Sequence, residues 1–416
     1  MNRSYDVAPV TPIDYRHLAE KRLPRFLFDY IDGGANDEQT MAANVADFAA
    51  VRLRQRVMRD VSGVDTSTTL AGRKVAMPLA LAPVGMAGMF ARRGEAMGAR
   101  AADHAGVPFT LSTLGVCTME ELRAASPSPF WFQLYMMRDR ATVQRLLARA
   151  RAAGVDTLLF TVDLAVTGLR HRDVRVGMLG RPTLKVKLGK LRQLVTRPGW
   201  IRDVGLGGKP HTIGNLSDVV PDPTDLNAYK AWIDAQFDAS VTWKDIEWLR
   251  RIWDGKLYIK GVLEADDARA AADVGADGVV VSNHGGRQLD GVASSIAKLP
   301  AVVAAVGDRV EILLDGGVRS GIDVLRAVAL GARGVLIGRP WVWATAGAGE
   351  QGLVDLLATF HGELRTAMAL AGVARIADAG PDLLDLRRIL APHDPANGCG
   401  CRRSPDAGVL RQEEEP

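Results

Sequence analysis

The sequence lacks the features that mark secreted or membrane-spanning proteins. It has only three cysteines in 416 residues, and their odd number and spacing argue against a disulfide-stapled fold and indicate a reducing compartment. No apolar core of signal-peptide length lies near the N-terminus, and no apolar run reaches the roughly 18 residues of a candidate membrane span. We therefore expect any membrane contact to be peripheral.

The chain also lacks the patterns that hold metals or nucleic acids. Cys399 and Cys401 stand together as Cys-Gly-Cys, but two ligands alone make a poor site, so no metal is predicted. The net charge is +4, yet no stacking platform or reading motif accompanies it, so nucleic acid is not an expected partner. With 47% hydrophobic and 24% charged residues, the composition is that of a globular protein with a large core.

What the chain does have is a short apolar run that recurs eight times. The runs lie at residues 77–83, 107–112, 130–135, 156–163, 256–261, 277–283, 311–317 and 333–338. They are continuous rather than alternating, which is typical of parallel strands covered on both faces. Helical patterns lie between most of them, and several of these end at a glycine that suits a left-handed C-cap.

Eight alternating strand and helix units predict an α/β fold built as a single (β/α)₈ TIM barrel, at residues 77–380. An open doubly wound sheet is the main alternative, but no glycine fingerprint follows Pro83. Residues 1–76 look helical and predict an N-terminal helical extension. Residues 177–232 are far longer than an ordinary loop and predict a basic insertion between strands four and five. Residues 381–416 are expected to form a C-terminal tail.

Polar side chains gather at the predicted strand ends, where a barrel of this kind has its active site. They are Gln133, Tyr135, Thr161, Asp163, Lys260, Ser282, His284, Asp315 and Arg339. Any one of them could be structural, but their convergence on one rim favours a site. We predict His284 as a base near neutral pH, Asp163 as the group that orients it, and Lys260 as a positive charge beneath a cofactor ring.

Charged side chains also predict two anion sites at this rim. Glycines and arginines follow strands seven and eight in "DGGVRSG" and "GRP", where barrels commonly bind phosphate. Arg319 and Arg339 could clamp its oxygens, although two glycine turns with solvated arginines are the structural alternative. Arg287 and Arg170 could hold a carboxylate. An anionic substrate, a base and a phosphate-bearing cofactor together indicate oxidation of a hydroxy acid.

Several longer stretches carry a family resemblance. "FDYIDGGAND", "WFQLYMMRDR", "FTVDLAVTGLRHRD", "LYIKGV", "SNHGGRQLDG" and "LLDGGVRSG…LIGRP" together closely resemble the FMN-dependent L-2-hydroxy-acid dehydrogenases and oxidases, and among them the quinone-linked L-lactate dehydrogenases of bacteria. The match runs from about Tyr15 to Ala379. The resemblance implies FMN as cofactor, oxidation of an L-2-hydroxy acid to a 2-oxo acid, and a homo-oligomer, a tetramer as in the family.

The resemblance assigns a role to each matching position. The implied catalytic residues are His284, Asp163, Tyr135 and Lys260. The implied substrate-binding residues are Tyr30, Arg170, Arg287, Tyr135 and Gly85. The implied FMN-binding residues are Pro83, Val84, Gly85, Ser112, Gln133, Thr161, Lys260, Ser282, Asp315, Gly316, Gly317, Arg319, Gly338 and Arg339. His284 would take the hydroxyl proton in a hydride route, or the α-proton in a carbanion route.

The insertion bears on the electron acceptor. Between Gly177 and Pro210 it has eight basic residues against one acid, Asp203, with Leu, Val, Ile and Trp interleaved. Such a segment suits an anionic membrane surface, and a solvated loop is the alternative. "RPGWIRDVGLGGKPHTIGN" is similar to the membrane-associated branch of the family, whereas the soluble oxidases have a shorter loop. This implies a membrane quinone as acceptor, with the protein peripheral on the cytoplasmic face of the cell membrane.

The substrate pocket departs from the glycolate-type pattern. Gly85 stands where those enzymes tend to have alanine, and Leu114 replaces an aromatic residue found in some relatives. The missing methyl group leaves room beside the substrate, so L-lactate, oxidised to pyruvate, or a larger acid is expected. The alternatives are a soluble oxidase that uses oxygen, a mandelate-type dehydrogenase, or a non-redox phosphate-binding barrel enzyme.

Overall fold

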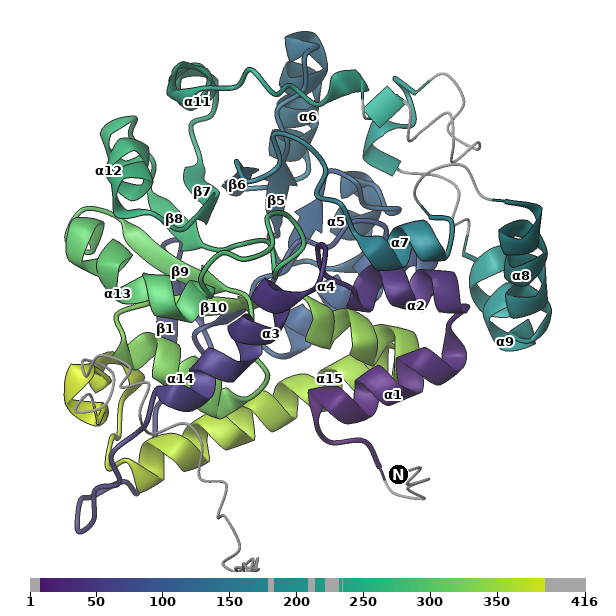
Figure 1. Ribbon diagram of the computed structural model, residues 1–416. Coiled ribbons are helices and arrows are strands. Elements are labelled where there is room, and N and C mark those ends of the chain that lie inside the picture. Colours follow the sequence, from purple (N-terminus) through teal and green to yellow (C-terminus); the bar gives the residue numbers. More distant parts are fainter. Residues whose placement is uncertain (1–7, 179–182, 209–213, 221–231, 234, 386–416) are drawn as a thin grey trace, which may run out of the picture.

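Eight short parallel strands form the barrel that the apolar runs predict (Figure 1). The computed structural model describes residues 8–178, 183–208, 214–220, 232–233 and 235–385. Its barrel strands are β3 (Leu79–Leu81), β4 (Thr110–Ser112), β5 (Trp131–Leu134), β6 (Thr157–Thr161), β7 (Lys256–Val262), β8 (Gly278–Val281), β9 (Glu311–Asp315) and β10 (Gly334–Ile337). Each strand lies within a predicted run or extends one residue beyond it. They pair in the order β3-β10-β9-β8-β7-β6-β5-β4, and a parallel bridge between Leu81 and Phe109 joins the two ends.

Alternate side chains along the strands divide the core in two. One set fills the barrel interior and consists of Ala80, Ala82, Trp131, Leu159, Tyr258, Val280, Leu313 and Leu336. The other set faces the helices and belongs to the larger outer core. Residues buried on both faces of a strand explain why the runs are continuous rather than alternating.

Helices cover the outside of the barrel. They are α4 (Gly94–His104), α5 (Met119–Ala125), α6 (Arg140–Ala152), α11 (Trp243–Ile252), α12 (Ala265–Asp273), α13 (Ser295–Val306), α14 (Gly321–Ala329) and α15 (Arg339–Leu370), the last with a break at Gly349. The glycines that the sequence places at helix ends have positive φ: 64° at Gly106, 80° at Gly154, 83° at Gly275 and 104° at Gly331. The predicted left-handed C-caps are therefore confirmed at these four helices.

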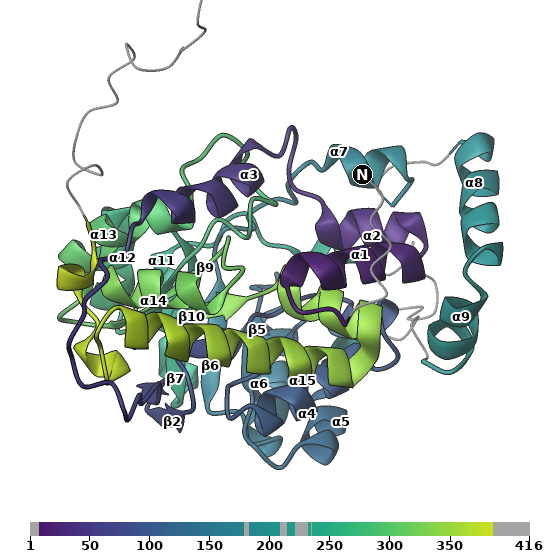
Figure 2. The ribbon, with the colours of Figure 1, turned by 90° about the horizontal axis from the view of Figure 1, so that it is seen from below.

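The N-terminal residues form more than helices. Helices α1 (Pro12–Arg22), α2 (Arg25–Asp32) and α3 (Gln39–Ala46) and the 3₁₀ turn η1 (Asp47–Ala50) come first, and α1 packs along α15 (Figure 2). A hairpin that the sequence reading did not predict follows, with β1 (Thr68–Leu70) antiparallel to β2 (Arg73–Val75). Its Leu70, Ala71 and Val75 join the interior cluster and so close the N-terminal end of the barrel.

Helix α7 (His171–Arg175) follows β6 and precedes the predicted insertion, whose described elements are α8 (Leu184–Val195), α9 (Pro198–Trp200), the π-helical turn η3 (Ile201–Leu206) and η4 (Gly214–Leu216). Helix α8 stands at the edge of the molecule, beside α2 (Figure 1). Arg181 and Lys209, which contribute to the predicted basic segment, lie outside the described residues. None of the described helices is both long and apolar enough to cross a bilayer.

The C-terminal region stays packed beyond the predicted boundary at residue 380. The turns η5 (Ile376–Asp378) and η6 (Pro381–Leu383) lead to Leu384, which is buried and bridges to Leu53. The rest of the predicted tail, including Cys399 and Cys401, lies outside the described residues. One further 3₁₀ turn, η2 (Ala87–Met89), follows the first barrel strand.

Candidate active site

The carboxyl ends of β4, β5 and β6 form a row of uncharged polar side chains. Ser112 donates to Oε1 of Gln133 at 3.1 Å, and the amide nitrogen of Gln133 donates to the Thr161 hydroxyl at 3.0 Å. All three residues are buried. Their mutual hydrogen bonds fix the direction in which each could bind a ligand, as the sequence reading expects for groups that face a cofactor ring.

The ends of β7, β8 and β9 form a charged row beside the first. Lys260 is 3% exposed, and its Nζ lies 2.8 Å from Asp315 and 3.1 Å from the Ser282 hydroxyl. Burial opposes the charge on Lys260, but Asp315 and Asp163 together raise its pKa. The residue therefore keeps its positive charge in a dry site.

His284 and Asp163 form a hydrogen-bonded pair across the rim. Nδ1 of His284 lies 2.9 Å from Oδ1 of Asp163. Although burial favours the neutral acid, His284 and Lys260 lower the pKa of Asp163, which stays ionised and can orient the ring. His284 itself has a φ of 58°, a left-handed conformation that is uncommon for a residue other than glycine and recurs at functional sites.

Two arginines flank the ring of Tyr30. The guanidinium of Arg170 lies 5.6 Å from the ring centre and that of Arg287 lies 5.1 Å from it. Nη1 of Arg287 donates to the carbonyl oxygens of Tyr30 and Gly33, both at 2.7 Å. Burial and the charge of Arg170 lower the pKa of Arg287. Two like charges held together in this way favour binding of an anion such as a carboxylate.

Tyr135 and Gly85 complete the predicted substrate side. Tyr135 follows β5 and packs edge-on against Phe237, with the two ring centres 5.3 Å apart. Burial raises the pKa of the Tyr135 phenol, which stays protonated. Gly85 follows Pro83 and Val84 after β3. A Cβ on Gly85 would lie 3.3 Å from the Cβ of Leu114. An alanine there would therefore crowd Leu114, and the expectation that Gly85 leaves room beside the substrate stays a prediction.

The ends of β9 and β10 carry the residues of the predicted phosphate site. Arg319 and Arg339 lie at the starts of α14 and α15, and neither makes an ion pair with another residue that the structure describes. Burial lowers the pKa of Arg319 to about 10, and burial together with Arg287 and Arg319 lowers that of Arg339 to about 9. A dianionic phosphate would provide the negative counter-charge for these two guanidinium groups.

The backbone around these arginines also fits such a group. Gly316 and Gly317 have positive φ, and a Cβ on Gly317 would overlap the Asn44 carbonyl. A Cβ on Gly338 would meet nothing closer than 3.9 Å, so the start of α15 is open to a ligand. Arg339 also donates to the carbonyls of Gly285 and Gly33, at 2.9 and 2.8 Å. It therefore ties the N-terminal segment to the rim in addition to the phosphate role expected of it.

Three further residues support the site, and the sequence reading missed them. Asp173 is fully buried and accepts from Nε of Arg170 at 2.6 Å. The amide of Gln288 donates to the carbonyls of Asp163 and Val166, at 2.9 and 3.2 Å. Asn44 exchanges two side-chain hydrogen bonds with Asn283, at 2.7 and 2.9 Å. The Arg-x-x-Asp spacing could have revealed Asp173, because residues three apart meet on a helix.

Comparison with known proteins agrees with this geometry. A family model described as FMN-dependent dehydrogenase matches residues 19–386. The L-lactate dehydrogenase of Caulobacter vibrioides is 56% identical over 371 residues, which are 89% of this chain and 96% of that protein. The L-lactate dehydrogenase of Chromohalobacter salexigens is 53% identical over 371 residues, which are 89% of this chain and 94% of that protein.

Solved structures give the same picture. The monotopic membrane protein (S)-mandelate dehydrogenase superposes with a TM-score of 0.84 and 36% identity, over 91% of this chain and 99% of that one. A mandelate oxidase superposes with a TM-score of 0.75 and 38% identity, over 89% and 97%. At these identities and coverages the similarity extends through the whole barrel and its flanking segments.

Proposed function

The chain belongs to the family of FMN-dependent dehydrogenases, and on that premise we propose that it oxidises L-lactate to pyruvate and passes the electrons to a membrane quinone. It is an FMN-dependent enzyme that oxidises 2-hydroxy acids. The preference for L-lactate is supported by the curated relatives, which are L-lactate dehydrogenases at 53–56% identity. The solved mandelate dehydrogenase at 36% identity makes L-mandelate the second candidate.

The proposed chemistry assigns one task to each group at the rim. Arg170 and Arg287 bind the carboxylate of the hydroxy acid, and Tyr30 donates a hydrogen bond to that carboxylate. Tyr135 contacts the substrate hydroxyl. His284 takes a proton from the substrate, and Asp163 stabilises the imidazolium that forms. FMN, when bound, accepts the two electrons that the substrate loses.

The rest of the rim would hold that cofactor. Ser112, Gln133, Thr161, Lys260 and Ser282 would contact its ring, together with the backbone of Pro83, Val84 and Gly85. Asp315, Gly316, Gly317, Arg319, Gly338 and Arg339 would hold its ribityl chain and phosphate. Lys260 would place a fixed positive charge beside the ring.

The observation that carries the proposal is the His284–Asp163 pair beside two clustered arginines at one barrel rim. We expect L-lactate to bleach the flavin absorbance anaerobically, faster than L-mandelate or glycolate does. A soluble quinone should then restore the absorbance, and air should yield little hydrogen peroxide. A flavin that no L-2-hydroxy acid reduces would contradict the substrate class, and rapid peroxide formation would identify an oxidase instead.

The membrane location is supported by the outer face of α8. Leu184, Leu188, Leu191 and Val195 follow helical spacing and are 58–73% exposed, while Lys185, Lys187 and Arg192 share the helix. An exposed leucine stripe beside basic residues suits the interface of an anionic bilayer.

We expect the double substitution Leu188→Gln and Leu191→Gln to release the protein from anionic vesicles, because it removes the centre of the stripe. Co-sedimentation measures the bound fraction, and L-lactate turnover with a soluble dye should be unchanged. The pair Leu289→Gln and Leu370→Gln, two equally exposed leucines away from α8, serves as a control. Equal release by both double variants, or a wild type that does not bind vesicles, would refute the membrane location.

A further inference from the structure

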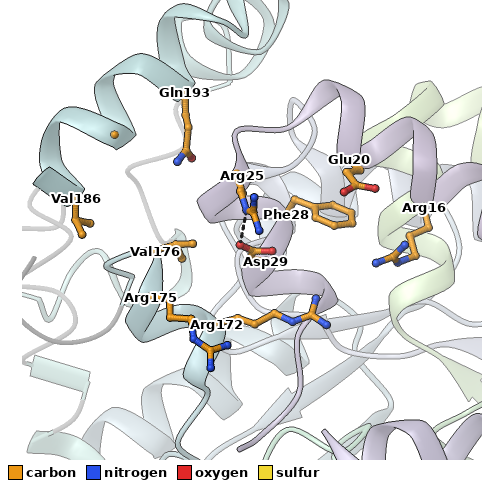
Figure 3. A pocket seen from close by; sticks show the side chains of 11 residues that line it. Arg16, Glu20, Arg25, Phe28, Asp29, Arg172, Arg175, Val176, Val186 and Gln193 are labelled. Atoms are coloured by element: carbon orange, nitrogen blue, oxygen red, sulfur yellow. Dashed lines mark hydrogen bonds and ion pairs between the residues drawn. The ribbon is translucent and has the colours of Figure 1, made fainter. Parts of the chain in front are cut away.

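A cavity of about 490 Å³ separates α8 from the N-terminal helices (Figure 3). It lies outside the candidate active site, on the other side of α2. Its lining residues come from helices α1, α2, α7 and α8 and from the residue that follows α7, and they are Arg16, Glu20, Arg25, Phe28, Asp29, Arg172, Arg175, Val176, Val186, Gly189 and Gln193. Val186 and Gln193 of α8 face Arg25 and Asp29 of α2 across it (Figure 3).

Helix α8 spans this cavity with little packing beneath it. None of its residues is buried. Gln193 accepts from the Phe26 amide at 3.1 Å, and Lys190 donates to the Gly177 carbonyl at 2.7 Å. A Cβ on Gly189 would meet no atom within 4 Å. A helix of 12 residues is marginal in water without tertiary packing, so a ligand beneath α8 would stabilise it.

Several arginines around the cavity are candidate contacts for an anion. Four guanidinium groups line it against two carboxylates, those of Glu20 and Asp29. Arg16 and Arg172 are already paired with Asp32, at 2.6 and 2.8 Å, and Arg172 also pairs with Glu38, at 2.5 Å. Arg25 lies 3.2 Å from Asp29.

Arg175 differs from the other three arginines. It is exposed and makes no ion pair with another residue of the described ranges. Together with Arg25, whose side chain is 76% exposed, it can offer guanidinium donors to an oxyanion, and phosphate suits that geometry.

The position of the cavity relative to the leucine stripe identifies the anion. The stripe is on the outer face of α8, and Val186, Gly189 and Gln193 are on the inner face. An interfacial helix buries its apolar face in the acyl region and leaves its polar face at the level of the headgroups. If α8 lies on a bilayer in this way, the cavity is at the depth of the lipid phosphates.

We propose that this cavity binds the phosphate headgroup of one anionic phospholipid per chain. The inference rests on the proposed membrane location of α8. It adds a saturable site of defined stoichiometry to what would otherwise be non-specific attraction between basic residues and a charged surface.

Titration of the flavin-loaded full chain with dihexanoyl phosphatidylglycerol, a short anionic lipid, tests the proposal by calorimetry. We expect saturable binding near one lipid per chain. Dihexanoyl phosphatidylcholine and inorganic phosphate should bind at least ten times more weakly, because the first is zwitterionic and the second has no glycerol ester to fill the cavity. Equal binding of either probe would overturn the proposal, and so would displacement of the lipid by a soluble quinone.

Two substitutions locate the site. Arg175→Gln should weaken lipid binding about tenfold, whereas Lys187→Gln, which removes the same charge from an exposed position outside the cavity, should not. Gly189→Leu should abolish binding, because its side chain would enter the cavity and leave the outer face of α8 unchanged. Normal lipid binding by Gly189→Leu would overturn the proposal.

Vesicle co-sedimentation separates this failure from failure of the membrane location. If Gly189→Leu binds both vesicles and the short lipid as the wild type does, the headgroup site is refuted and the membrane location stands. If the wild type does not sediment with anionic vesicles, both are refuted.

Discussion

Replacing His284 with alanine is expected to lower the rate of flavin reduction by L-lactate about 10²–10⁴-fold, because a positioned general base contributes that much. The protein should still contain FMN, since the predicted cofactor contacts come from other side chains. Anaerobic stopped-flow absorbance at the flavin maximum measures the rate. His104→Ala, at an exposed helical histidine, provides the matched control and should reduce at the normal rate.

The backbone at His284 calls for a second variant. Its φ of 58° is tolerated better by asparagine than by alanine. His284→Asn should therefore fold at least as well as His284→Ala and be equally inactive. Loss of FMN from both variants, or a near-normal rate in either, would contradict the assignment of His284 as the base.

Replacing Arg287 with methionine is expected to lower kcat/KM for L-lactate about 10²–10⁴-fold. Removing one partner of a buried charge pair costs about 3–5 kcal/mol, and each factor of ten corresponds to about 1.4 kcal/mol. Arg287→Lys should recover only part of the loss, because an ammonium group cannot reproduce a planar, bidentate contact. Steady-state turnover with a soluble dye measures both variants.

An uncharged substrate distinguishes carboxylate binding from a structural role of Arg287. L-Lactamide lacks the charge that the guanidinium would bind, so we expect the wild type to oxidise it poorly and Arg287→Met to be little worse. Arg287 also donates to the carbonyls of Tyr30 and Gly33. If the main effect of the substitution were loss of these contacts, lactamide and lactate would be affected equally.

The fold could be predicted largely from local pattern. Strands buried on both faces leave continuous apolar runs, and helix ends leave glycines such as Gly154 and Gly275, so both signals are present in short segments. The hairpin of β1 and β2 was missed because its strands are mostly not buried and so leave no continuous apolar run, and it covers the barrel end only after the chain has closed. Its apolar residues Leu70 and Val75 carry no periodic pattern of their own.

The candidate site could be predicted from the sequence to a similar extent. Parallel strands bring their carboxyl ends to one rim, so His284, Asp163 and Lys260 could be grouped before their distances were known. The contacts that support these three residues could not be predicted. Gln288 meets the Asp163 carbonyl, and Asn44 meets Asn283, through loops whose paths depend on the whole barrel.

The segment that forms α8 was predicted to be basic and amphipathic, but the sequence did not predict that it is a helix or that a cavity lies beneath it. The gap arises from how α8 sits relative to α2, and the residue that leaves it open, Gly189, resembles any other helical glycine in the sequence.

Because the β1–β2 hairpin closes one end of the barrel, the order of the steps in turnover is restricted. The hairpin residues Leu70, Ala71 and Val75 and the filled interior leave no route through the barrel. Any molecule that must reach the rim arrives from the same side. When the acid and a diffusible acceptor use one entrance, the oxo acid has to depart before the acceptor can take its place. Initial rates measured against both reactants should then give parallel double-reciprocal lines, the pattern of a double-displacement cycle.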